Sequence, residues 1–172
     1  FFFKQKTAYE IVDCDWSSDV CSSDLMIDPW LQLTVIFNTI LAAILGSIIG
    51  YERDRAGKSA GPRTMALVAA AAALVVSMGE IINLSAKFGD PTRSMHAIMT
   101  GIGFLGAGLI FSNQARGVKG VTTAATVFAT AAMGCGVGLG FQLAAAAMTL
   151  VVIAILRSTQ VLERTLHSND DN

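Results

Sequence analysis

Charged side chains gather at two places in an otherwise apolar sequence. The first place follows the first long apolar stretch and holds Glu52, Arg53 and, after Gly61 and Pro62, Arg63. Mixed charges of this kind are typical of a solvated surface or of ion pairs at helix ends, which contribute about 0 to 1 kcal/mol each. The same residues are equally compatible with a docking surface for a protein partner.

The second place precedes the third apolar stretch and holds Asp90, Arg93 and His96. Asp90 suits the N-cap of a helix that begins at Pro91, and Arg93 and His96 then lie on one face of that helix. Charged groups at membrane depth are costly and are usually paired, so Glu80 or Asp90 is a candidate partner for Arg93. These residues predict a structural clamp at the membrane interface or, alternatively, a ligand, proton or ion site.

Catalytic and metal-binding patterns are missing from the sequence. The two histidines, His96 and His167, fall on opposite sides of the expected membrane, and neither H-E-x-x-H nor C-x-x-C occurs. Gly101-x-Gly103-x-x-Gly106 matches a dinucleotide-binding pattern, but that pattern requires a preceding strand, and helix is expected on both sides here. No basic run with interleaved aromatic residues indicates nucleic acid. We therefore expect no enzymatic activity, no cofactor, no bound metal and no nucleic-acid partner.

A glycine-rich block lies inside the third apolar stretch, with glycines at Gly101, Gly103, Gly106 and Gly108. Each glycine would weaken a helix in water by about 1 kcal/mol relative to alanine, whereas in a membrane glycines let helix backbones approach closely. At about 100° per residue, Gly103 shares a face with the two charged residues before it, and Gly101 and Gly108 lie beside that face. The bulky aliphatic residues gather on the other side, although Phe104 and Phe111 break the pattern. We expect the small face to meet other helices and the bulky face to meet lipid. Leucine at Gly103 or Gly106 should then disrupt packing.

The elements that must position these residues are membrane-spanning helices. Hydrophobic residues make up 53% of the chain and charged residues only 15%. A hydrocarbon core about 30 Å thick requires roughly 20 apolar residues per helix. The predicted fold class is all-α, a polytopic membrane helix bundle with about five transmembrane helices. The expected spans are residues 30–50, 64–84, 91–112, 121–138 and 141–156, the last two divided near the glycines at 136–140.

The ends of the chain differ in composition from the middle. Residues 1–25 have no apolar core and contain the near-repeat Ser-Ser-Asp-Val and Ser-Ser-Asp-Leu, so we expect a non-native, adapter-derived and disordered extension. Residues 26–166 are expected to form the transmembrane domain, and residues 167–172 a polar tail. Cys14 and Cys21 fall in the extension. Cys135 lies in an apolar segment and is expected to be a small buried packing residue.

Basic residues in the short loops predict the orientation of the helices. Most of the lysines and arginines after residue 25 fall on one side of the expected membrane, whereas Lys87 and Arg93 fall on the other. Because cytoplasmic loops carry an excess of lysine and arginine, the N-terminus is predicted outside and the C-terminus in the cytoplasm. The residues on the basic side are Arg53, Arg55, Lys58, Arg63, Arg116, Lys119, Arg157 and Arg164.

Small residues also recur at four-residue intervals in two other apolar stretches, which keeps them on one helix face. Such stripes are typical of close helix packing, in which threonine hydroxyls can also bond across helices. A lined permeation path is the alternative interpretation. The two stripes are Asn38, Ala42, Gly46 and Gly50, and Thr122, Thr126, Thr130, Gly134 and Gly138.

Taken together, these residues resemble the MgtC/SapB family of bacterial inner-membrane proteins. The matching motifs are Gly46-x-x-x-Gly50-x-Glu52-Arg53, Gly61-x-Arg63-Thr64, Asp90-Pro91-x-Arg93, the block from Gly101 to Gly108, and Gly120-x-Thr122-Thr123-Ala124-Ala125. The resemblance covers about residues 30–157, and the glycine block joined to the threonine–alanine motif is its most specific part. Pro62 and Val121 stand where leucine is common in the family. We expect this chain to lack the soluble C-terminal domain of longer members, so the roles of that domain are not transferred.

The resemblance implies a role in adaptation to magnesium limitation and, in pathogens, in virulence. Members are thought to modulate membrane partners, including the rotary ATP synthase and sensor kinases, and not to carry magnesium. We therefore expect a regulator that acts by helix–helix contact, with homo-oligomerisation favoured by the small-residue stripes. The alternative is a small transporter or channel subunit for magnesium or another ion, although no acidic residue is expected at mid-membrane to supply oxygen ligands. The candidate functional or packing residues are Glu52, Arg53, Arg63, Asp90, Arg93, His96, Gly101, Gly103, Gly106, Gly108, Thr122 and Thr123.

Overall fold

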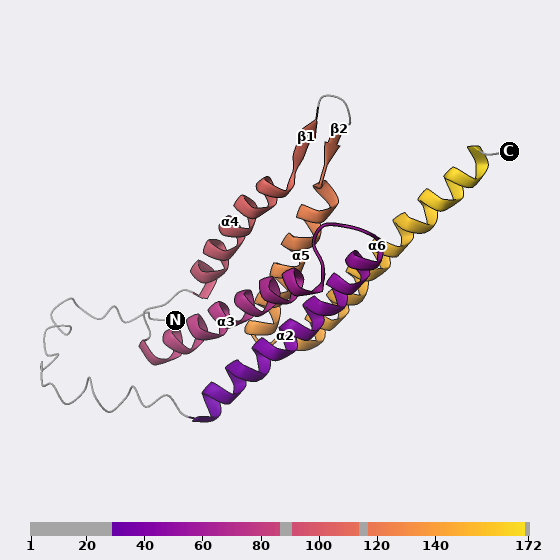
Figure 1. The fold of residues 1–172 in the computed structure, drawn as a ribbon. Helices are drawn as coiled ribbons and strands as arrows, with labels where there is room; N and C mark the ends of the chain where they lie inside the picture. The colour runs from indigo at the N-terminus through magenta and orange to yellow at the C-terminus, as the bar shows by residue number, and fades with distance from the viewer. Residues whose placement is uncertain (1–28, 87–90, 114–116, 171–172) are drawn as a thin grey trace, which may run out of the picture.

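Five helices and one short β-hairpin make up the part of the chain that the computed structural model describes, residues 29–86, 91–113 and 117–170. The predicted all-α class is confirmed, and each helix corresponds to one of the five expected stretches. Residues 1–25, Asp90 and Arg116 lie outside the described residues. In chain order the elements are α2 (Pro29–Arg55), α3 (Pro62–Ala86), α4 (Pro91–Leu109), β1 (Phe111–Asn113), β2 (Gly117–Lys119), α5 (Val121–Gly138) and α6 (Gln142–Asp170) (Figure 1).

Each of the chain's three prolines is the first residue of a helix: Pro29 begins α2, Pro62 begins α3 and Pro91 begins α4. Proline suits this position because its φ angle is already helical and its missing N–H would have no partner within the helix. Proline also disfavours helical conformation in the residue before it, which separates each helix from the preceding chain. The predicted start of the third span at Pro91 is therefore confirmed.

The break between α5 and α6 lies where the glycine-rich sequence predicted it. Gly140 adopts a φ of +86°, which glycine reaches without strain. Its N–H donates to the carbonyl of Val137, and the N–H of Phe141 donates to the carbonyl of Gly136, both at 2.9 Å. This pair of bonds commonly ends helices that finish with a glycine. The chain reverses there, and α6 packs back along α5.

A short hairpin that the sequence analysis did not predict joins α4 to α5. Helix α4 ends at Leu109, earlier than the expected residue 112, and β1 then pairs antiparallel with β2, with Phe111 opposite Lys119. The hairpin leads into Gly120, which has a φ of +91° and is the N-cap residue of α5. Figure 1 shows the hairpin at the end of the α4–α5 pair.

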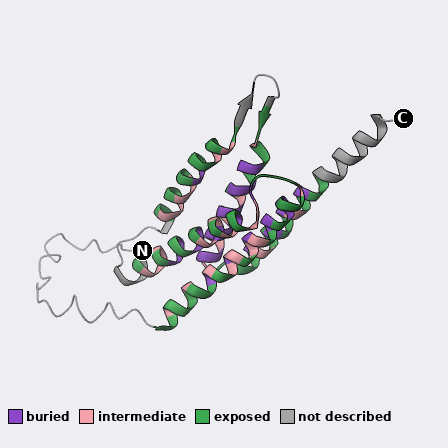
Figure 2. Cartoon of the chain, in the orientation of Figure 1, coloured by how far each residue is buried: buried purple, intermediate pink, exposed green. Residues whose placement is uncertain are grey.

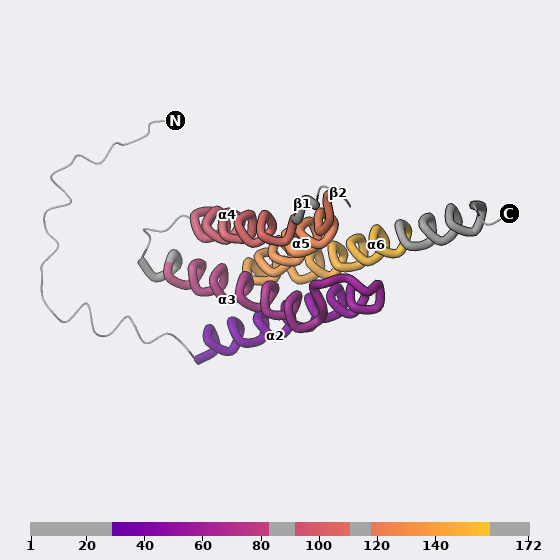
Figure 3. The backbone as a smooth tube through the Cα atoms, turned by 45° about the horizontal axis from the view of Figure 1, so that its top comes forward, coloured from indigo at the N-terminus to yellow at the C-terminus, as the bar shows by residue number. Residues whose placement is uncertain are grey.

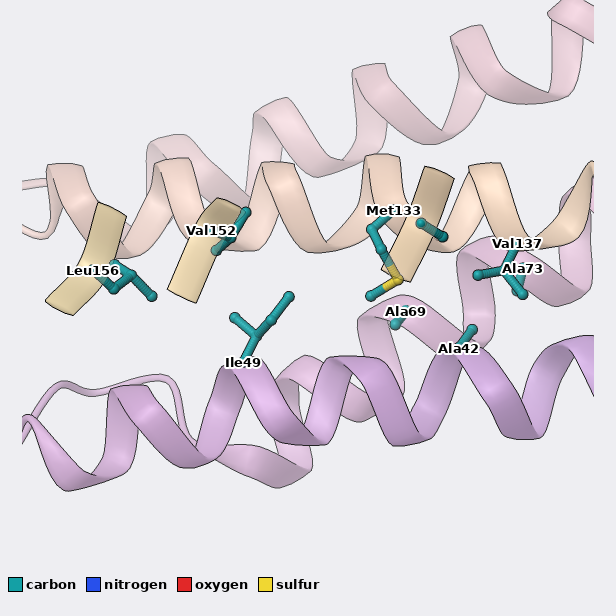
Figure 4. Close-up of a cluster of buried hydrophobic side chains, with 9 residues drawn as sticks. Ala42, Ile49, Ala69, Ala73, Met133, Val137, Val152 and Leu156 are labelled. Carbon is teal, nitrogen blue, oxygen red and sulfur yellow. The ribbon is translucent and has the colours of Figure 1, made fainter. Parts of the chain in front are cut away.

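Helices α2, α3 and α5 form the most closely packed part of the bundle. A Cβ atom added at Gly46 of α2 would lie 2.6 Å from the carbonyl oxygen of Met65, and one added at Gly134 of α5 would lie 2.5 Å from that of Ala69. Glycine thus lets the backbone of α3 nearly touch a neighbour on two sides. Around these contacts, buried side chains from four helices point toward one another (Figure 4). They include Ala42, Ile49, Ala69, Ala73, Met133, Val137, Val152 and Leu156.

Both four-residue stripes lie in this packed centre, as the packing interpretation predicts. All of their residues are buried except Thr122, which is exposed. The threonine hydroxyls bond mainly along α5 itself: Thr126 donates to the carbonyl of Thr122 at 2.7 Å, and Thr130 to that of Thr126 at 2.8 Å. The hydroxyl of Thr130 also lies 3.5 Å from the sulfur of Met65 on α3. The stripe of α5 is therefore filled by α3.

The outer surface of the bundle is apolar, which is the reverse of a protein folded in water. On α2, Ile36, Ile40, Ile44 and Ile48 are exposed, whereas the polar Asn38 is buried. Figure 2 colours the chain by burial and shows exposed residues along the outside of the helices. Three helices within the described residues are long and apolar enough to cross a membrane, and one further apolar segment, Gln142–Ser158, is shorter. The three are Pro29–Arg55, Pro62–Ile82 and Val121–Gly138.

Candidate functional site

The last turn of α2 directs two charged side chains toward different neighbours. Glu52 and Arg53 are adjacent in the helix, so their side chains point about 100° apart. Both are buried: Glu52 is 6% exposed and Arg53 is 2% exposed. Arg63, in the first turn of α3, is exposed. Two of the candidate residues therefore lie inside the protein, and the third lies on its surface.

Arg53 reaches the first turn of α5. Its Nη2 donates a hydrogen bond to Oγ1 of Thr123, which is itself buried. Its Nε is also buried but has no hydrogen-bond partner in the described part of the chain. Thr122, next to Thr123, is exposed. Two motifs that the sequence analysis named separately are thus joined by one bond between residues 70 positions apart.

Glu52 reaches α6 instead. Nη2 of Arg157 donates to Oε2 of Glu52 at 3.1 Å, and the two side chains form an ion pair. The Glu52 side chain is 7% exposed and that of Arg157 is 64% exposed, so the carboxylate lies inside and the guanidinium faces outward. In the sequence, Arg157 indicated only the orientation of the helices. A basic residue after an apolar stretch is common in membrane proteins, so nothing local identified it as a partner of Glu52.

This difference in exposure predicts an asymmetric response to mutation. Arg157→Met leaves a buried carboxylate without its partner and is expected to cost about 1–3 kcal/mol. Glu52→Gln keeps an acceptor oxygen and leaves Arg157 in solvent, so it is expected to cost less than about 1 kcal/mol. Thermal unfolding of the purified protein in detergent measures both, with Arg55→Met as the control at an exposed arginine of the same turn. A larger loss for Glu52→Gln than for Arg157→Met would contradict the assigned geometry.

These contacts bring basic residues together at one end of the bundle. The end of α2, the start of α5 and the end of the apolar part of α6 meet there through the bonds of Arg53 and Glu52. Figure 3 shows α2, the hairpin and α6 reaching the same end. Within the described residues, this end carries Arg53, Arg55, Lys58, Arg63, Lys119 and Arg157 against Glu52 and Asp54.

Most of the glycine-rich block of α4 is exposed and makes no close helix contact, contrary to the prediction. Gly101, Gly103 and Gly108 are exposed, and a Cβ atom added at any of them would meet no atom within 4 Å. At Gly106 the added Cβ would lie 3.7 Å from the Cβ of Ala124, which is an ordinary contact. The expectation that leucine disrupts packing is therefore wrong for Gly103 within this chain, and no close approach supports it at Gly106.

The bulky face of α4 packs inward instead. Ile102 is buried, and Ile98 and Met99 are half-buried against α3 and α5. The opposing surface offers several alanines, so large side chains from α4 are needed to fill the space at interior packing density. Hydropathy could not predict this, because lipid is as apolar as the protein interior. The side chains that α4 contacts include Ala60, Met65, Val127, Ala131, Ala72, Val76 and Cys135; the last is buried, as predicted.

Arg93 and His96 are exposed on α4, near its start. Within the described residues no ion pair joins Arg93 to Glu80, and Asp90 lies outside them. The clamp and the ligand site both stay predictions for this end of α4. The described residues also contain no group of three or more histidine, cysteine, aspartate or glutamate side chains that could hold a metal ion.

A known protein family matches this chain over most of its helices. The model of the MgtC family matches residues 39–165, which include the buried Arg53–Thr123 contact and the glycine block of α4. This chain belongs to the MgtC family. It is therefore a membrane protein of the MgtC type, and the resemblance drawn from its motifs is confirmed. No solved structure matches the chain.

Individual relatives match between 71% and 81% of the chain. A protein of Haemophilus influenzae is 31% identical over 154 residues, which cover 80% of this chain and 64% of that protein. Protein MgtC of Brucella abortus is 42% identical over 126 residues, 71% of this chain and 51% of that protein. Protein MgtC of Salmonella typhimurium is 36% identical over 140 residues, 81% of this chain and 58% of that protein. The chain thus spans between about half and two thirds of the length of these relatives.

Proposed function

We propose that this MgtC-family protein is a non-enzymatic modulator of membrane partners that acts through helix–helix contact. The observation that carries the proposal is the uncovered small-residue face of α4. The stripes on α2 and α5 are already filled by α3, whereas a Cβ at Gly101 or Gly108 would meet nothing within 4 Å. In lipid, faces of small residues favour association because they allow close backbone approach and van der Waals contact. The face of α4 is therefore suited to a helix from outside this chain.

The proposal includes a location and a physiological setting. We place the protein in the bacterial inner membrane as a multi-pass protein, with the N-terminus outside and the basic end of the bundle in the cytoplasm, because lysine and arginine are enriched on that side. The setting is adaptation to magnesium limitation and, in a pathogen, virulence. The partners are membrane complexes such as the ATP synthase or sensor kinases, or a second copy of this chain.

Leucine on the uncovered small-residue face of α4 is expected to weaken partner binding without weakening folding. Gly101→Leu and Gly108→Leu should leave the melting temperature unchanged, because a Cβ atom at either position meets no other atom within 4 Å. The same variants should lose most of the partner that native-membrane cross-linking and affinity purification recover at low magnesium, because leucine holds the backbones apart. Ile40→Phe is the control, since it adds bulk on the exposed face of α2. Unchanged recovery in both leucine variants, at normal protein levels, would rule out this face as the contact.

The competing function is a small transporter or channel subunit for magnesium or another ion. Proteoliposomes that contain only this protein distinguish the two functions, because a modulator that acts by contact carries no ion by itself. Measured flux of magnesium or another ion into such vesicles would contradict the modulator proposal. Absence of flux together with loss of partner recovery in the leucine variants would support it.

A further inference from the structure

Arg53 is a buried cation for which the described part of the chain supplies no carboxylate. The one ion pair near it joins Glu52 to Arg157 and leaves Arg53 out. Within the described residues, its side chain donates one hydrogen bond, to the neutral hydroxyl of Thr123, and its Nε has no partner. Burying a charge is costly unless the charge is paired and hydrogen-bonded. Among the residues that the structure describes, no carboxylate therefore forms an ion pair with Arg53.

The first turn of α5 places a second positive feature beside Arg53. The first N–H groups of a helix have no partner inside it, and that end carries a partial charge of about +0.5. Such groups are often satisfied by the side chain of the N-cap residue, but here that residue is Gly120 and no side-chain cap is present. The guanidinium of Arg53 is directed into this same turn through Thr123. Two positive features therefore lie side by side and repel each other.

The same turn also reaches the surface. Val121 is 53% exposed and Thr122 is exposed, whereas Thr123 is 5% exposed and faces Arg53. Lys119, just before the turn, is exposed as well, and the end of the bundle around it is rich in basic residues. The start of α5 is therefore open to an anion from outside, and Thr123 links the same turn to the buried guanidinium of Arg53.

We propose that the first turn of α5 and Arg53 bind a phosphate group. The oxygens of a phosphate accept bonds from several N–H groups at once, which suits both an uncapped helix start and an unpartnered guanidinium nitrogen. Its charge offsets the repulsion between the two positive features. The phosphate belongs either to a phospholipid headgroup or to a soluble compound, since both present the same oxyanion. This site is independent of the α4 face and does not rest on the proposed modulator function.

The test compares two sources of phosphate on the full chain, purified and delipidated in detergent. One arm measures the melting temperature in inorganic phosphate against chloride at equal ionic strength. The other arm adds phosphatidylglycerol or, as the zwitterionic control, phosphatidylcholine to the micelles. Both arms are repeated with Arg53→Met, which removes the buried charge, and with Arg55→Met, the matched change at an exposed arginine two positions along α2.

A saturating probe is expected to raise the melting temperature of the unaltered chain by about 5 °C or more. Arg53→Met should lose the shift and Arg55→Met should keep it. A shift with inorganic phosphate identifies a soluble source, and a shift with phosphatidylglycerol alone identifies a lipid headgroup. No shift in either arm, an equal shift with phosphatidylcholine, or an equal loss in Arg55→Met would overturn the proposal. If Arg53→Met does not fold, Arg53→Lys replaces it and should reduce the shift by at least half, because lysine lacks the guanidinium fork.

Discussion

Gly120→Ala is expected to lower the free energy of unfolding by about 3 kcal/mol or more, which would remove most of the folded protein from detergent extracts. Gly120 has a φ of +91°, and an alanine in this left-handed region costs about 1–2 kcal/mol. The added Cβ would also overlap the carbonyl oxygen of Leu109 at the end of α4. Neither backbone can retreat freely, because the β1–β2 pairing holds the end of α4 against the start of α5. Size-exclusion profiles and melting temperatures measure the loss.

Gly140→Ala is the control that separates backbone strain from collision. Gly140 has a similar φ of +86°, but a Cβ there would meet nothing within 4 Å. Its replacement should therefore cost only the conformational part, about 1–2 kcal/mol, and should leave a folded protein with a lowered melting temperature. If both variants lost the same stability, the close contact between Gly120 and Leu109 could not be part of the folded protein.

Gly134→Ala is the second change with a large expected effect, about 3 kcal/mol at the upper end of the range for an overpacked interior. The added Cβ would lie 2.5 Å from the carbonyl oxygen and 3.1 Å from the Cα of Ala69. Both atoms belong to the backbone of α3 and cannot rotate away as a side chain would. The whole of α3 must therefore move from α5, which opens the buried contacts around Ala73 and Val137. Thermal unfolding in detergent measures the loss.

Gly136→Ala, about half a turn along the same helix, should not lower the free energy of unfolding and is expected to raise it slightly. A Cβ at Gly136 would meet nothing within 4 Å, and alanine favours the helix by roughly 0.5–1 kcal/mol over glycine. The melting temperature should stay unchanged or rise slightly. A similar loss in Gly134→Ala and Gly136→Ala would mean that general helix perturbation, and not the approach of α3, decides the outcome.

The sequence predicted the helices well because their limits depend on local backbone chemistry. Pro91 suits the first position of α4 because its φ angle is already helical, and Gly140 allows the left-handed turn that ends α5. The stripe from Thr126 to Gly138 also predicted a packed face, because small residues at four-residue intervals stay on one side of a helix. Each of these features involves residues within a few positions of one another.

Features that depend on the arrangement of the helices were not predictable in the same way. The inward face of α4 could not be read from hydropathy, since Ile102 is equally stable against lipid and against protein. The partners of Glu52 and Arg53 lie 105 and 70 positions away, and no short pattern encodes which helix each side chain meets. The sequence named these residues as candidates, but only the fold shows that they divide between α6 and α5.

Helices in this bundle meet either backbone to backbone at glycines or through large side chains, and the two kinds of contact resist motion differently. Sliding α3 along α2 or α5 would drive a carbonyl oxygen, such as that of Met65 or Ala69, into a neighbouring backbone, so these three helices must move as one body. Helix α4 rests on Met99 and Ile98, whose side chains can change rotamer as packed helices shift by small sliding steps. Small displacements are therefore easier for α4, away from the hairpin that joins it to α5, than for α2, α3 or α5.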